Sequence, residues 1–231
     1  MGLLQQLRRR PEPGARVTSR AAVGPEATSP LDVLSFWFPR GLDADEAAHR
    51  AQFQWWFGGG ADGEIAARFA PLVAAAAAGA LDAWAVCPRG RLALILLCDQ
   101  FPRSLYCDTS RAYALDGRAV TLALTGLDQG HYERLATVWE KLFFSMPLSH
   151  SENLALHQRN VLLAEDLVAE APAPLRRLYL FSAGQARGHR DVIARFGRHS
   201  HRNALLGRVS TPEEQAYLAA GDFVHRRRFQ G

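Results

Sequence analysis

The sequence predicts an all-α fold, a single-domain helical bundle or solenoid of about nine helices. From Ser29 onward, apolar residues recur at three- and four-residue spacing in most segments, and no run shows the strict alternation of a strand. Helix-start signatures recur along the chain, including proline at the first helical position and two capping-box patterns. The length of 231 residues and the 48% hydrophobic content suit one domain with a sizeable core.

Glycine, proline and acidic residues bound the first four predicted helices. Ser29-Pro30 begins the first helix and Pro39 stops it, while the acidic cap Asp43-Ala44-Asp45-Glu46 begins the second and the glycines 58–60 end it. Asp62 opens the third, which Gly79 stops, and Pro102 ends or kinks the fourth. The four helices are expected over residues 30–38, about 43–57, 62–78 and 89–100.

The second half of the chain predicts five more helices. Ser149 and Glu152 have capping-box spacing, as have Thr211 and Glu214, where Pro212 strengthens the signal. Several helices pair as helix–turn–helix units, which favours a tetratricopeptide-like stack, although no strict sequence repeat is visible. These helices are expected over residues 108–125, 132–144, about 149–171, 174–196 and from 211 onward.

Charge and cysteine usage limit the function classes. The net charge of +4 comes from the ends, since residues 1–28 hold five arginines against two glutamates and residues 226–228 are all arginine. We therefore expect no nucleic-acid partner, which would favour a basic face on the folded body. We divide the chain into a disordered or leader segment over 1–28, the helical domain over 29–222 and a basic tail over 223–231.

The longest apolar run, residues 92–98, is too short to span a bilayer. The three cysteines lack paired metal-site spacing, so free thiols in the cytoplasm are expected.

Residues 189–203 form the stretch richest in candidate site residues. His189 falls on the apolar stripe of its helix, where an unpaired polar side chain costs several kcal/mol. The turn that follows gathers hydrogen-bond donors, which either bind an anion or cap the carbonyl groups that end the helix. These donors are Arg198, His201, Arg202 and Asn203.

Two further phrases carry titratable groups. Asp99 continues an apolar stripe and so points inward, as a base, a metal ligand or the ion-pair partner of Arg103. Arg103 would otherwise hold a carboxylate or phosphate. Glu152 is a capping-box residue or a site carboxylate, His150 has no evident structural role, and His157 is expected to be solvated.

The sequence does not determine whether the protein holds a cofactor. His189, His199 and His201, with His150 and Asp99 or Glu152, would suffice for a single metal, but their spacing matches no recognised signature. The chain has no P-loop and no G-x-S-x-G, so nucleotide use and serine nucleophile chemistry are not expected.

Several phrases resemble a bacterial family named domain of unknown function 924. They are residues 36–38, 81–84, 92–103, 147–152 and 196–203, and the resemblance covers about residues 30–222. It implies an all-helical, tetratricopeptide-like fold and supplies no activity. His199-Ser200 stands where the family usually has Phe-Pro, and Ser149 where it usually has methionine. The family's polar phrases fall on Asp99, Gln100, Arg103, His150, Glu152, Gln158, His189, Arg198, His201, Arg202 and Asn203.

Two hypotheses follow. In the first, the polar side chains converge on one pocket that binds a small anionic molecule. Arginines, His201 and Asn203 would hold the ligand, and His150 or His189 with Asp99 or Glu152 would transfer a proton, with or without a metal. In the second, the chain is a tetratricopeptide-like scaffold without catalytic activity, and its concave face takes a peptide or protein partner.

Overall fold

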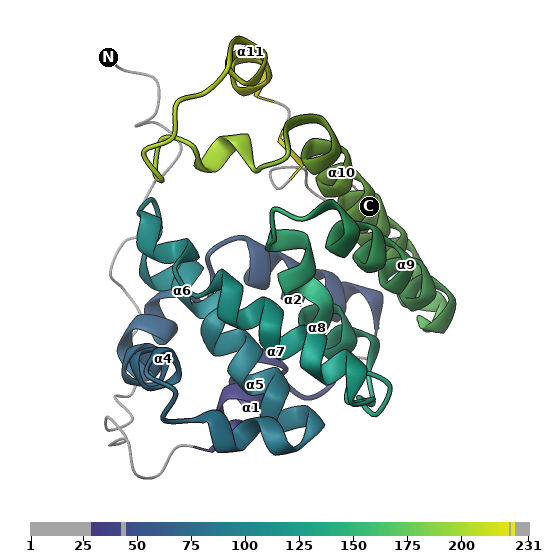
Figure 1. Ribbon diagram of the computed structural model, residues 1–231. Helices are drawn as coiled ribbons and strands as arrows, with labels where there is room; N and C mark the ends of the chain where they lie inside the picture. The colour runs from purple at the N-terminus through teal and green to yellow at the C-terminus, as the bar shows by residue number, and fades with distance from the viewer. Residues whose placement is uncertain (1–28, 43–44, 222, 225–231) are drawn as a thin grey trace, which may run out of the picture.

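The computed structural model describes residues 29–42, 45–221 and 223–224, and these form helices and turns with no strand (Figure 1). The all-α prediction is therefore confirmed. The 1–28 segment, residues 43–44 of the predicted acidic cap and the tail over 225–231 lie outside the described residues. The α-helices are α1 (Pro30–Trp37), α2 (Glu46–Phe57), α3 (Asp62–Glu64), α4 (Ala70–Ala77), α5 (Pro88–Cys98), α6 (Gln100–Leu105), α7 (Asp116–Asp128), α8 (Val138–His150), α9 (Leu154–Glu170), α10 (Arg176–Phe196) and α11 (Pro212–Ala220).

Shorter turns join these helices. The predicted third helix is divided by a π-helical turn, η2 (Ile65–Phe69), so that α3 and α4 lie on either side of it. The remaining short elements are 3₁₀ turns: η3 (Asp82–Val86), η4 (Ser110–Tyr113), η5 (Ala173–Leu175) and η6 (Ser200–Arg202).

Helix α5 is the centre of the core. Its residues 90–98 are all buried, and α1, α4, α6, α7 and α8 pack around it. The apolar stripe that Asp99 continues predicts one buried side, but a nearly continuous apolar run buries every side when helices surround it. Gly90 allows η3 to approach, because a Cβ there would lie 2.1 Å from the carbonyl oxygen of Trp84. Tetratricopeptide-like stacking of the helices stays a prediction.

Capping groups set several helix starts as predicted. Asp32 accepts a hydrogen bond from the backbone N–H of Ser29, and Asp45 accepts one from that of Ala48. At the start of α11, Thr211 and Glu214 form the predicted capping box. These bonds satisfy backbone donors that the first helical turn leaves unpaired.

The break between α5 and α6 falls at Asp99, not at Pro102. Proline is the third residue of α6, and the first turn of a helix needs no N–H from that position. The break leaves Asp99 at the end of α5, fully buried, and places Arg103 one turn further along.

The predicted capping box at Ser149 and Glu152 is wrong. Helix α8 begins at Val138, later than expected, and continues through Pro147 to His150. Asn153 caps α9 instead, because its side chain accepts from the N–H groups of Ala155 and Leu156. His150 thus ends α8, and Glu152 lies in the link between α8 and α9.

The antiparallel pair α9 and α10 lies along one side of the bundle, and the chain then returns through residues 197–211, which we call the return segment (Figure 1). Gly197 ends α10 in the left-handed conformation at φ 67°, which glycine adopts without strain. Of the predicted tail, Phe223 and Val224 are buried, and Val224 accepts a hydrogen bond from Gln185. In the described part of the chain, no helix is long and apolar enough to cross a membrane.

Candidate functional site

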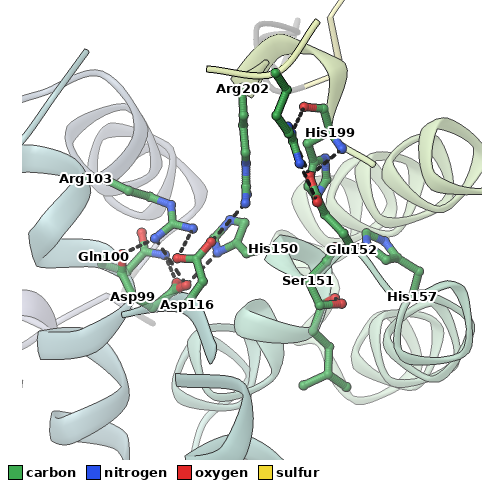
Figure 2. Close-up of polar contacts among 12 residues, drawn as sticks. Asp99, Gln100, Arg103, Asp116, His150, Ser151, Glu152, His157, His199 and Arg202 are labelled. Atoms are coloured by element: carbon green, nitrogen blue, oxygen red, sulfur yellow. Dashed lines mark hydrogen bonds and ion pairs between the residues drawn. The ribbon is translucent and has the colours of Figure 1, made fainter. Parts of the chain in front are cut away.

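A histidine–aspartate pair lies where α8 meets the end of α5. His150 Nδ1 is 2.7 Å from Asp99 Oδ1, although the two residues are 51 positions apart in sequence (Figure 2). The second carboxylate oxygen of Asp99 accepts from the Gln100 amide at 2.5 Å. Asp99 is fully buried, so these contacts replace the hydration that the charged carboxylate loses.

Two arginines extend this pair through a second carboxylate. Arg103 lies 3.4 Å from Asp99 and 2.9 Å from Oδ1 of Asp116, the first residue of α7. Oδ2 of Asp116 accepts from Arg202 of η6, also at 2.9 Å (Figure 2). The guanidinium carbon of Arg202 lies 4.5 Å from the centre of the Tyr113 ring, a cation–π contact. The network joins α5, α6, α7, α8 and the return segment.

A surface pocket of about 410 Å³ opens beside this network. Its polar wall includes His150, Arg202 and Asp116, and its apolar wall includes Tyr113 and Leu206. The other lining residues are Ser110, Ala114, Gly117, Val120, Ser151 and Glu152. The volume lies at the small end of the range of about 300–1,000 Å³ that is usual for small-molecule sites.

Charges in the network set its protonation states. Burial by itself would raise the pKa of Asp99, but the charges of Arg103 and His150 hold that pKa below its usual range. Burial and the neighbouring Arg103 lower the pKa of His150, and Asp99 offsets only part of this. At neutral pH the pair is therefore an aspartate anion and a neutral imidazole.

The hydrogen-bond capacity left over in the network is mainly of the donor kind. Both carboxylate oxygens of Asp99 and of Asp116 already accept from arginine, histidine or glutamine. On Arg202 only Nη1 has a hydrogen-bond partner among the described residues, and the buried Nε has none. His150 Nε2 likewise has no partner within the described chain. A ligand that brings acceptor atoms would satisfy the Arg202 donors, and Nε2 of His150 would donate to it once protonated.

A second polar cluster holds the return segment in place. Glu152 accepts from Arg208 through both oxygens, at 2.7 and 3.0 Å, and from the backbone N–H of His199 at 2.9 Å. Glu214 accepts from Arg198 at 2.7 and 2.6 Å and from Ser200 at 3.0 Å. These bonds lower the pKa of both glutamates, although burial acts in the opposite direction at each.

Arg198 and Asn203 therefore have structural partners. Arg198 also donates to the carbonyl oxygen of Val209, and Asn203 donates to the hydroxyl of Ser210. These bonds link parts of the return segment to one another and to α11, and neither side chain reaches the last carbonyl groups of α10.

Four histidine rings gather where the return segment meets α9 and α10. The ring of His199 lies 5.7 Å from that of His157, 5.9 Å from that of His189 and 5.5 Å from that of His201, between ring centres. His199 is 1% exposed, and neither of its ring nitrogens has a partner among the described residues. No three His, Cys, Asp or Glu side chains in the described ranges are placed to hold a metal ion.

His157, expected to be solvated, is fully buried, and its Nε2 lies 2.8 Å from the carbonyl oxygen of Ser151.

The structure thus divides the residues singled out in the sequence. Asp99, Arg103, His150 and Arg202 share the network, and Glu152 lies at the pocket wall. The others lie elsewhere: His189 and His201 against His199, and Arg198 and Asn203 around α11 and residues 209–210.

The sequence analysis missed two residues of the site. Asp116 was placed inside a predicted helix over 108–125, whereas a 3₁₀ turn and a new helix start put its carboxylate at the pocket. Tyr113 had no signal beyond its type. The Leu115-Asp116-Gly117 sequence, with an acidic residue suited to a first helical turn, could have indicated the helix start.

Fold and site together define an all-helical protein with a buried central helix and a histidine–aspartate pair at a small pocket. The chain belongs to the family described as bacterial protein of unknown function (DUF924), whose model matches residues 33–222. It is similar to the solved structure of a protein of unknown function from Agrobacterium tumefaciens. The two share 34% sequence identity with a TM-score of 0.68, and the match covers 83% of this chain and 97% of the other. No curated protein matches the chain.

Proposed function

We propose that this protein binds a small anionic molecule in the pocket and exchanges a proton with it through His150. Asp99 positions the ring, and Arg202 supplies the hydrogen bonds that hold the anion. The observation that carries the proposal is the imbalance in the network, where carboxylate oxygens are paired while Arg202 Nε and Nη2 have no partner in the described chain. The carboxylates of Asp99 and Asp116 already face arginine, histidine and glutamine donors, whereas an anion supplies acceptors for the unpaired donors of Arg202.

The proton-transfer part depends on the tautomer of His150. An ionised Asp99 can only accept, so the hydrogen between them sits on Nδ1 and the lone pair sits on Nε2. His150 lines the pocket and its pKa is lowered, so a neutral base is available to a bound molecule near neutral pH. A fixed carboxylate behind a histidine keeps this tautomer in place and stabilises the protonated ring once it forms.

Calorimetric titration with acetate, benzoate and inorganic phosphate tests the binding step. At least one anion is expected to bind the wild type, and Arg202→Met should weaken it by about tenfold or more, which corresponds to about 1.4 kcal/mol. Arg187→Met is the matched control, because Arg187 pairs with Glu165 on the exposed face of α9 and α10. Leu206→Trp should weaken binding by filling the pocket from a position that is 38% exposed, where a larger ring need not disturb the core.

The scaffold hypothesis predicts a different outcome. If none of the three anions binds, and His150→Ala changes only the thermal stability, then the network is an internal support and the search moves to peptide and protein partners. Equal weakening by Arg202→Met and Arg187→Met would also contradict the proposal, since a general loss of positive charge would then explain both.

A further inference from the structure

We infer that the ligand is a monocarboxylate with an apolar or aromatic body, and that it binds together with one proton taken up by His150. The inference rests on the proposed function and specifies the ligand of the same pocket. Three features support it: the charge balance of the network, the position of His150 as its one neutral titratable base, and the carbon-rich remainder of the pocket lining.

The charges in and behind the pocket wall cancel. Arg103 and Arg202 carry two positive charges against Asp99 and Asp116, and Arg208 balances Glu152. With His150 neutral the network has no excess positive charge, so a bound anion would add one uncompensated negative charge. Protonation of His150 supplies one positive charge and no more. A monoanion with one proton leaves the network neutral, whereas a dianion leaves an excess charge in a partly desolvated site.

The anion itself would drive this protonation. A negative charge about 4 Å from the ring raises the pKa of His150 by about one to three units, depending on solvent screening. Protonated His150 then donates from Nε2 to one ligand oxygen while Arg202 donates to the other. The titratable and charged groups that act on His150, or meet it across the pocket, are Asp99, Arg103, Tyr113, Asp116, Glu152, His157, His199 and Arg202.

The remaining pocket wall favours a hydrocarbon body. Besides the charged residues and His150, the lining consists of the Tyr113 ring, Ala114, Gly117, Val120 and Leu206, with the two serines Ser110 and Ser151. A fully hydrated ion such as free phosphate would leave this surface uncovered, whereas an aromatic or short aliphatic group would bury it at about 25 cal/mol per Å². In a pocket of about 410 Å³, a carboxylate at the polar wall leaves room for a small ring.

Three matched probes test the inference by calorimetry near neutral pH: benzoate, phenyl phosphate and benzyl alcohol. Each titration is run in Bis-Tris and in Tris, whose different ionisation enthalpies reveal proton uptake. We expect benzoate to bind with an uptake approaching one proton, phenyl phosphate to bind about tenfold more weakly, and benzyl alcohol not to bind measurably. His150→Gln should weaken benzoate and abolish the proton uptake, whereas Arg187→Met should leave both unchanged.

The outcomes separate this inference from the proposed function. Tighter binding of phenyl phosphate, or benzoate binding without proton uptake, overturns the monocarboxylate assignment and leaves anion binding at Arg202 intact. Tighter binding of benzyl alcohol than of benzoate overturns the assignment too, because the pocket would then select neutral molecules. If benzoate, phenyl phosphate, acetate and inorganic phosphate all fail to bind, both the monocarboxylate assignment and the proposed function are contradicted.

Discussion

Replacing His199 with leucine is expected to stabilise the protein and to reduce its sensitivity to acid. His199 is 1% exposed, and its two ring nitrogens have no partner in the described chain. A buried polar group without a hydrogen bond costs about 1–3 kcal/mol, and leucine has a similar volume and no polar atoms. Some ring contacts with His157, His189 and His201 are lost, so a net gain of about 1 kcal/mol is expected at neutral pH.

The gain should grow as the pH falls. Burial, and then the charge of Arg202, lower the pKa of His199 in the folded state, while in the unfolded chain it stays near 6.5. Below that value the unfolded chain binds a proton that folded His199 does not, so the wild type loses stability with falling pH. Between pH 7 and pH 5 this one group contributes a loss of about 2 kcal/mol. His199→Leu has no ring to protonate at this position, so its free energy of unfolding does not include this loss.

Urea unfolding followed by circular dichroism at pH 7 and pH 5 measures both effects. Other buried histidines, such as His49 and His157, are present in both proteins, so the difference between wild type and His199→Leu isolates one ring. His199→Phe serves as a second variant, because the family resemblance places phenylalanine at this position. Destabilisation of both variants by the same amount at both pH values would refute the reasoning, since the ring would then be satisfied and its proton affinity ordinary.

Three other substitutions have expected outcomes. Glu214→Gln should lower the free energy of unfolding in urea titrations, because the buried side chain loses its charge-assisted hydrogen bonds from Arg198. Gly126→Ala should destabilise by about 1–2 kcal/mol despite the better helix propensity of alanine, since its Cβ would lie 2.4 Å from Phe144; an unchanged melting temperature would contradict this packing. Asp99→Asn should lower the pKa of the neighbouring histidine further, as NMR titration would detect, because the aspartate charge is what raises it.

The sequence predicts the helices well because their signals are local. The proline start at Pro30, the capping box at Thr211 and the glycine stop at Gly197 act within a few residues, and the structure keeps all three. Ser149 and Glu152 have the same local pattern, but Glu152 pairs with Arg208, which lies 56 positions away. That partner is a property of the fold, and a local pattern cannot indicate it.

Part of the site is predictable, because local sequence patterns indicate which polar side chains are buried. Asp99 extends an apolar stripe, so the sequence indicates that it is buried and needs partners. Its partner His150 comes from another helix, and their contact depends on how α8 crosses α5. Asp116 and Tyr113 join the pocket because of an unforeseen turn between Cys107 and Asp116. Residue type and spacing identify side chains that need partners, whereas the choice of partner requires the tertiary structure.

The state of His150 with and without a bound anion tests the central claim most directly. NMR titration of its ring, with and without saturating benzoate, reports the tautomer and the pKa together. The proposal predicts a neutral ring with hydrogen on Nδ1, a pKa below 6.5 in the free protein and a clear rise when benzoate binds. A free pKa above 6.5, or a titration that saturating benzoate leaves unchanged, would contradict it.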